Sequence, residues 1–86
     1  MPIIKSVNGK HPQIPEDCFV AENATILGEV SLGKECSIWY NAVIRGDVHY
    51  IKIGNKVNIQ DGAVIHATYQ KSPTTIGNNV SIGHNA

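Results

Sequence analysis

The sequence predicts an all-β fold, a parallel β-helix built from triangular coils. Branched aliphatic residues recur every six positions, and a second series of mostly small residues follows each of them by four. Glycine and asparagine gather after these positions, where tight turns need unusual backbone angles. A period of six fits neither the 3.6-residue helix nor a long alternating strand. It fits short strands separated by corners, with three sides closing one coil.

The two series define the expected interior of the coils. The first consists of Val20, Ile26, Leu32, Ile38, Ile44, Ile53, Ile59, Ile65, Ile76 and Ile82. The second consists of Ala24, Val30, Cys36, Ala42, Val48, Val57, Ala63, Tyr69, Val80 and Ala86. Neither series contains a charged residue, so both are expected to point inward. The coils should then stack as parallel strands about 4.8 Å apart.

The elements follow in order along the chain. Residues 1–19 hold three of the four prolines and lack the repeat, so this segment is expected to wrap or cap the first coil. Residues 20–86 form the repeat region. The β-branched tripeptides at 24–26, 30–32, 57–59, 63–65 and 80–82 are the expected strands.

Two insertions interrupt the count of six. The first is expected at Tyr50-Ile51-Lys52 in the second coil, and the second near residues 71–75 in the third coil. A fourth coil has only begun at Ile82. Solenoids need a cap at each end, so we expect C-terminal coils and a cap to be missing from this sequence after about three coils.

Composition narrows the possible partners. Seven Lys and Arg residues balance seven Asp and Glu residues, so no nucleic-acid surface is predicted. No apolar run is long enough to span a membrane or to form a signal-peptide core, which predicts a cytoplasmic protein without a membrane partner. Cys36 is expected to fill a core position, and no disulfide with Cys18 is predicted.

Stacking the coils sorts the polar residues by corner. The first corner follows Ile38, Ile59 and Ile82, and it carries Trp39, Tyr40, Gln60, Asp61 and His84. The second corner follows Ile26, Ile44 and Ile65, and it carries Arg45, Asp47 and His66. One side holds these corners up to about 20 Å apart, so His66 and His84 cannot bind one metal ion within a single chain. A threefold assembly that sets the first corner of one chain against the second corner of the next would unite them.

Four ordered motifs resemble those of the gamma-class carbonic anhydrases, a family of hexapeptide-repeat proteins. They are Arg45-Gly46-Asp47, Asn58-Ile59-Gln60-Asp61-Gly62, Ile65-His66 and Ile82-Gly83-His84-Asn85-Ala86. The resemblance implies a left-handed β-helix and a homotrimer with one metal ion between each pair of subunits. The implied metal is Zn²⁺, or Fe²⁺ or Co²⁺ in its place.

The resemblance also implies residue roles. His66 and His84 match two metal ligands from different subunits, and the third ligand would lie five residues after His84, beyond this sequence. We therefore expect the 86-residue chain to be inactive by itself. Arg45 and Asp47 match an interchain salt bridge beside the metal. Gln60 matches a residue that hydrogen-bonds metal-bound hydroxide or substrate, and Asp61 matches a residue that supports this network.

The sequence departs from the best-known members of that family at two places. Val48 and the segment 67–71 offer no carboxylate where those enzymes carry acidic proton-transfer residues. The chain thus resembles a short-loop branch that includes thioesterases. Metal-dependent hydration of CO₂ to bicarbonate is the leading prediction. An acyl-CoA thioesterase or hexapeptide acyltransferase, and a non-catalytic scaffold whose polar corner residues are structural, remain alternatives.

Overall fold

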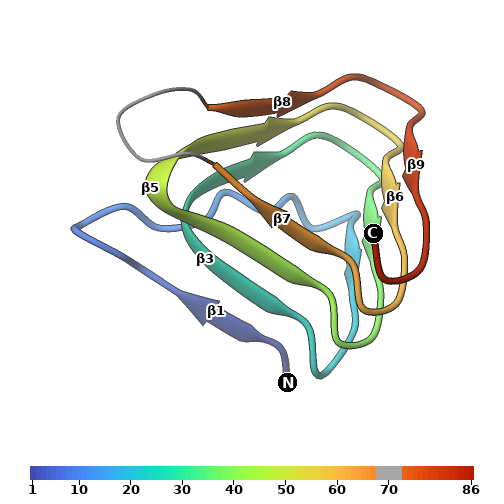
Figure 1. The fold of residues 1–86 in the computed structure, drawn as a ribbon, viewed down its shortest axis with the longest axis horizontal. Helices are drawn as coiled ribbons and strands as arrows, with labels where there is room; N and C mark the ends of the chain where they lie inside the picture. The colour runs from blue at the N-terminus through green and yellow to red at the C-terminus, as the bar shows by residue number, and fades with distance from the viewer. Residues whose placement is uncertain (68–72) are drawn as a thin grey trace.

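The computed structural model describes residues 1–67 and 73–86, which form nine β-strands and no helix. The strands are β1 (Ile3–Lys5), β2 (Phe19–Val20), β3 (Thr25–Leu32), β4 (Ser37–Ile38), β5 (Val43–Ile53), β6 (Asn58–Ile59), β7 (Val64–His66), β8 (Thr74–Ile76) and β9 (Ser81–Ile82). Every pairing between these strands is parallel. Figure 1 shows the chain winding through stacked triangular turns. The predicted all-β parallel β-helix is confirmed.

None of the described residues belongs to a helix that could cross a membrane.

The strand register aligns aliphatic residues of the same side from coil to coil. One sheet, with the order β2-β4-β6-β9, aligns Val20, Ile38, Ile59 and Ile82. The other sheet aligns Ile26, Ile44 and Ile65 on one side, and Leu32, Ile53 and Ile76 on the next. The predicted assignment of hexads to three sides is therefore confirmed.

The N-terminal segment lies along the open edge of the first predicted coil. β1 pairs with β3 so that Ile4 is opposite Ile26, which extends the inward stack by one residue. Further along, the backbone N–H of Gln13 donates to the carbonyl of Val30 at 2.8 Å. The edge of β3 is therefore hydrogen-bonded rather than open, although the boundary at residue 19 remains a prediction.

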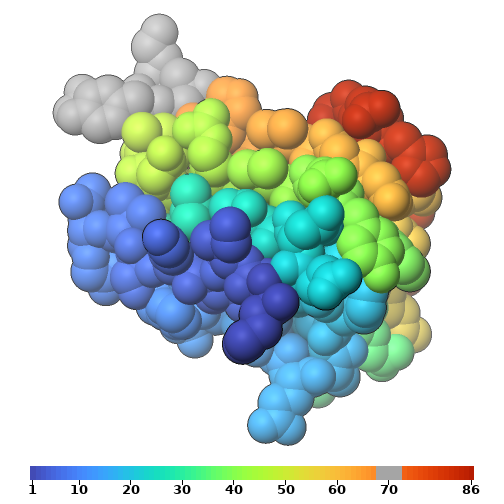
Figure 2. All heavy atoms as spheres, turned by 90° about the horizontal axis from the view of Figure 1, so that it is seen from below, coloured from blue at the N-terminus to red at the C-terminus, as the bar shows by residue number. Residues whose placement is uncertain are grey.

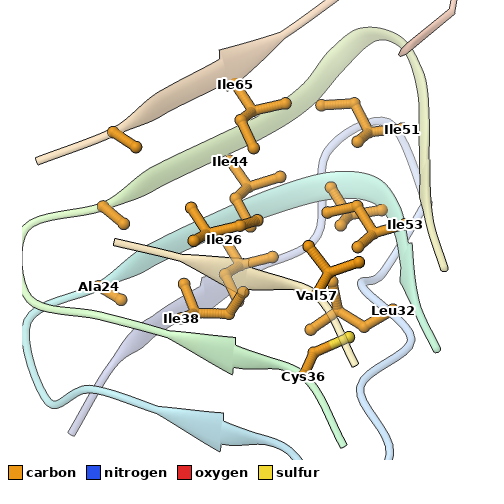
Figure 3. Packing of buried hydrophobic residues seen from close by; sticks show 14 of the residues in the cluster. Ala24, Ile26, Leu32, Cys36, Ile38, Ile44, Ile51, Ile53, Val57 and Ile65 are labelled. Atoms are coloured by element: carbon orange, nitrogen blue, oxygen red, sulfur yellow. The ribbon is translucent and has the colours of Figure 1, made fainter. Parts of the chain in front are cut away.

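The interior of the coils is a single aliphatic column. Ile26, Ile38, Ile44 and Ile59 are 0% exposed, and no charged side chain is buried among the described residues. Figure 3 shows isoleucines from different sides of the triangle pointing toward one another. Burial of apolar area is the dominant favourable term in folding, so this column is what holds the coils together.

The second corner differs from the prediction because the strands do not break there. β3 and β5 each run around it as one bent strand, with a register shift between Gly28 and Val30. Gly28 has a φ of 77°, and a Cβ there would lie 2.5 Å from the carbonyl oxygen of Gly46. A Cβ on Gly46 would lie 2.5 Å from the carbonyl oxygen of Glu29. Only glycine at both positions permits so close an approach of the two backbones.

The predicted position of the first insertion is wrong. Ile51 pairs with Val30 and is 1% exposed, whereas Val48 is 39% exposed. The three extra residues therefore lie in the outward bulge 47–50, which stands opposite the single residue Glu29, and Ile51 fills the inward slot that the sequence assigned to Val48. The larger Ile51 buries more apolar surface, and Ile51 and Ile53 alternate with the exposed Lys52 as an inward-facing strand requires.

The third coil shows a related difference. Thr74 pairs with Ile51, so Thr74 occupies the slot that the sequence assigned to Tyr69. Tyr69 and the first part of the second predicted insertion lie outside the described residues.

Asparagine side chains tie neighbouring coils together at the third corner. The Oδ1 atom of Asn55 accepts a hydrogen bond from the backbone N–H of Lys34, and that of Asn78 accepts one from the backbone N–H of Asn55, both at 2.8 Å. The residue that follows Lys34, Glu35, and the residue that follows Asn55, Lys56, are stacked on each other and adopt left-handed φ angles of 57° and 56°. The asparagine side chains thus accept hydrogen bonds from backbone N–H groups of the turn in the neighbouring coil.

Candidate functional site

The second corner brings together three of the predicted site residues. Arg45 of β5 is the register partner of His66 of β7, so their side chains project from adjacent rungs of one sheet. The Nη1 atom of Arg45 lies 3.2 Å from Oδ2 of Asp47. Gly46 lies between these two residues and packs against the backbone of Glu29. This close contact between β3 and β5 holds the strand in place up to Gly46, so the bulge starts at Asp47.

One carboxylate oxygen of Asp47 has no partner in the described part of the chain. Its Oδ1 atom is buried and accepts no hydrogen bond, while Oδ2 binds Arg45. A buried acceptor without a donor costs free energy, so this oxygen marks a place where a further donor would be stabilised. Arg45 and Asp47 form an ion pair within this chain, and the interchain bridge that the resemblance implies stays a prediction.

The imidazole of His66 is oriented by the backbone. Its Nδ1 lies 3.4 Å from the carbonyl oxygen of Ala67. The carbonyl of His66 itself accepts a hydrogen bond from the hydroxyl of Thr74 at 2.8 Å. An Nδ1–H directed at a carbonyl leaves Nε2 with its lone pair, the arrangement usual for a metal-binding histidine. Thr74 gave no signal in the sequence, because it lies beyond an insertion that breaks the period.

The first corner collects the other three predicted residues. Gln60, Asp61 and His84 line a pocket of about 260 Å³ together with Trp39 and Asn58. The Nδ1 atom of His84 lies 3.8 Å from Oδ1 of Asp61, an ion-pair distance when the histidine is protonated. Both side chains are more than half exposed, so the carboxylate can orient the imidazole while its Nε2 side stays accessible.

Aromatic rings form one wall of this corner. The ring centroids of Phe19 and Trp39 are 4.8 Å apart, and those of Trp39 and Tyr40 are 6.4 Å apart. Phe19 and Tyr40 are each 43% exposed. Phe19 therefore joins Trp39 and Tyr40, the two aromatic residues that the sequence placed at the first corner.

Asn58 is a further candidate that sequence reasoning missed. Its Oδ1 atom is buried without a hydrogen-bond partner in the described residues, and the residue lines the same pocket as Gln60. The signal was present in the sequence, because residues two apart on a strand project from the same face. Asn58 and Gln60 thus present two amide side chains to one pocket.

The donor groups of the two corners have the chemistry of metal ligands. Within residues 1–67 and 73–86 no group of three or more His, Cys, Asp or Glu residues is arranged to hold one. Each corner instead offers one imidazole, His66 or His84, with Nδ1 facing an oxygen. Zn²⁺ accepts neutral imidazole nitrogen and prefers four ligands, so the donor chemistry fits while one chain supplies too few donors at either corner.

The repeat defines the class of protein. Residues 11–46 match the family model described as bacterial transferase hexapeptide, six repeats. The structure also aligns with that of a hexapeptide transferase family protein from Anaplasma phagocytophilum, with a TM-score of 0.90 and 42% identity over 96% of this chain and 48% of that one. The chain is therefore similar to hexapeptide-repeat proteins in both sequence and fold.

Within this class, sequence similarity points to the gamma carbonic anhydrases. The chain is 46% identical to a carbonic anhydrase of Geobacillus kaustophilus, over 95% of this chain and 44% of that protein. It is 42% identical to gamma carbonic anhydrase 2, mitochondrial, of Arabidopsis thaliana, over 96% of this chain and 32% of that protein. The predicted resemblance is confirmed, and the chain spans less than half the length of these relatives.

Proposed function

We propose that this chain forms part of a metal-dependent enzyme that reversibly hydrates CO₂ to bicarbonate at sites between the subunits of a homotrimer. The observation that supports this most directly is the division of the polar residues. Each of two separate corners carries one imidazole whose Nδ1 faces an oxygen, the carbonyl of Ala67 for His66 and the carboxylate of Asp61 for His84, as a site completed by a second subunit would require. The carbonic anhydrases among its relatives support the reaction.

His66 and His84 would hold the metal, which is Zn²⁺ or, in its place, Fe²⁺ or Co²⁺. When bound, such an ion lowers the pKa of a coordinated water to about 7 and so supplies a nucleophile at neutral pH. Asp61 would keep the His84 ring in position through its contact with Nδ1.

The amide side chains would bind and orient the substrate. Gln60 and Asn58 share the pocket beside His84. The buried Oδ1 atom of Asn58, which has no hydrogen-bond partner in the described residues, would accept a hydrogen bond. The Arg45–Asp47 pair would stabilise the opposite wall, and the unpaired Oδ1 of Asp47 could accept a hydrogen bond from the neighbouring subunit.

Metal analysis and a CO₂ hydration assay on the natural full-length protein test this proposal. We expect His66→Ala and His84→Ala each to remove bound metal and hydration activity. His11→Ala is the matched control, because His11 lies in the N-terminal segment and is absent from both corners. Full metal content in either corner variant would contradict the proposed ligands.

Subunit mixing tests whether the site is shared. His66→Ala chains keep an intact first corner, and His84→Ala chains keep an intact second corner. If each site combines the two corners of different subunits, random mixed trimers should recover about one quarter of the wild-type sites. No recovery in trimers shown to be mixed would contradict a shared site.

Acyl-CoA hydrolysis or acyl transfer is the second candidate function. The transferase hexapeptide match and the hexapeptide transferase structure favour it. Turnover of an acyl-CoA without bound metal would support this alternative over CO₂ hydration. A metal-free trimer without activity on either substrate would support a scaffold.

The proposed location is the cytoplasm. The Arabidopsis relative carries the word mitochondrial in its name. Fractionation of cells that produce the natural full-length protein distinguishes the two locations.

A further inference from the structure

A polar cleft of about 550 Å³ lies outside both corner clusters. The N-terminal segment, β3 and the end of β5 form its walls, and it contains none of the six predicted site residues. Its volume is within the range of about 300–1,000 Å³ that is usual for small-molecule sites. In Figure 2 these segments belong to successive layers, blue, cyan and green, on one face of the molecule.

The floor of this cleft is a row of polar side chains on adjacent strands. Gln13 is bridged to Ser31, and Ser31 is the register partner of Lys52. Their neighbours Val30 and Ile51 are buried in the core, so by strand alternation these three side chains project outward. Rungs of a parallel sheet are about 4.8 Å apart, which places an amide, a hydroxyl and an ammonium group side by side.

Two lysines in the cleft form no ion pair within residues 1–67 and 73–86. Lys10 and Lys52 both line it, and neither takes part in the two ion pairs found in the described part of the chain. Glu29 is the one carboxylate in the lining. The cleft therefore carries a net positive charge at neutral pH from lysine and glutamate alone.

Two of the remaining polar residues, His11 and Gln13, make local hydrogen bonds. The Nδ1 atom of His11 lies 2.9 Å from the hydroxyl of Ser6, which directs the Nε2 edge of the ring away from that contact. The side chain of Gln13 donates to the carbonyl of His11 at 3.3 Å. The lining thus combines two ammonium groups with further hydrogen-bonding side chains, two of which belong to the linked residues His11 and Gln13.

We propose that this cleft binds a small multivalent oxyanion, a compound that carries phosphate or several carboxylate groups. Hydrogen bonds between ammonium groups and oxyanions are charge-assisted and about twice as strong as neutral ones. A ligand with two or more negative groups contacts both Lys10 and Lys52, and Ser31 and Gln13 supply further donors. Glu29 repels a third negative group and so favours a ligand whose charge lies toward the lysines.

Calorimetric titration with inorganic pyrophosphate and with citrate, at fixed ionic strength, tests the proposal. We expect saturable binding of at least one of them, and a loss of affinity of about tenfold or more for Lys10→Gln and for Lys52→Gln. Glu29→Gln should strengthen binding. Binding of pyrophosphate alone identifies phosphate compounds as the ligand class, and binding of citrate alone identifies polycarboxylates.

Lys34→Gln and Lys56→Gln are the matched controls, because these exposed lysines lie at the third corner, away from the cleft. Each removes the same unit of charge from the protein. An equal loss of affinity in the control variants would show that the attraction is only a general effect of charge and would overturn the proposal. Absence of saturable binding by either anion would overturn it as well.

Discussion

Gly28→Ala should destabilise the coil strongly, through two effects at one atom. An L-residue with the φ of 77° found at Gly28 costs about 1–2 kcal/mol relative to glycine. The added Cβ would also meet the carbonyl oxygen of Gly46 at 2.5 Å, where an ordinary contact begins at 3.4 Å. β3 and β5 must then separate by about 0.9 Å, and such overpacking costs about 1–3 kcal/mol. We expect a total loss of about 3 kcal/mol in the free energy of unfolding.

Urea unfolding followed by the fluorescence of Trp39, the only tryptophan, measures this loss. Gly77→Ala is the matched control, because a Cβ at Gly77 meets no atom within 4 Å and its φ is not positive. The control should change stability by no more than about 1 kcal/mol, in the stabilising direction if the unfolded chain loses freedom. A Gly28→Ala loss below about 1 kcal/mol would refute the reasoning about the close contact.

Three further perturbations test the core, the asparagine hydrogen bonds of the third corner and the partly buried thiol of Cys18. Ile44→Ala should cost about 3 kcal/mol because Ile44 is 0% exposed, whereas Val64→Ala, at 49% exposure, should cost well under half as much in the same urea titration. Asn55→Ala removes the acceptor for the Lys34 amide, and we expect a loss of about 1 kcal/mol together with faster hydrogen exchange at that amide. Burial raises the pKa of Cys18 above its ordinary value of 9.0, so alkylation of this thiol should reach half its maximal rate above that pH. The stability that the protonated thiol contributes is then complete below pH 9.0 and is lost as the pH rises through the folded pKa, and Cys18→Ser should abolish this alkaline loss.

The sequence was sufficient to predict the fold because every inward position obeys one physical requirement. Ile26, Ile44 and Ile65 must each fill the same space in successive coils, so a period of six in aliphatic residues also gives the register. The first insertion was misplaced because Val48 and Ile51 are both branched and lie three residues apart. Which of them points inward depends on the path of the bulge, and no periodic count contains that information.

The sequence was sufficient to predict which site residues lie at the same corner, but not which of their side chains are in contact. The register placed Arg45 beside His66, as the count of six requires. The contact between Asp61 and His84 depends on side-chain conformations, and the buried oxygen of Asn58 depends on how neighbouring coils cover it. Neither property repeats along the sequence. The roles of these residues remain predictions that the metal and mixing experiments test.

The second corner has consequences for how proteins of this architecture diversify. In β3, two residues lie between Leu27 and Val30, which are paired on either side of this corner. Their partners in β5 are Arg45 and Ile51, and five residues lie between these. Seven separate the corresponding partners His66 and Thr74 in the next coil. The segments differ in length while the paired residues on either side keep their alignment. Insertions and deletions at this corner can therefore change the surface next to the candidate site. The inward-facing aliphatic residues and their register need not change.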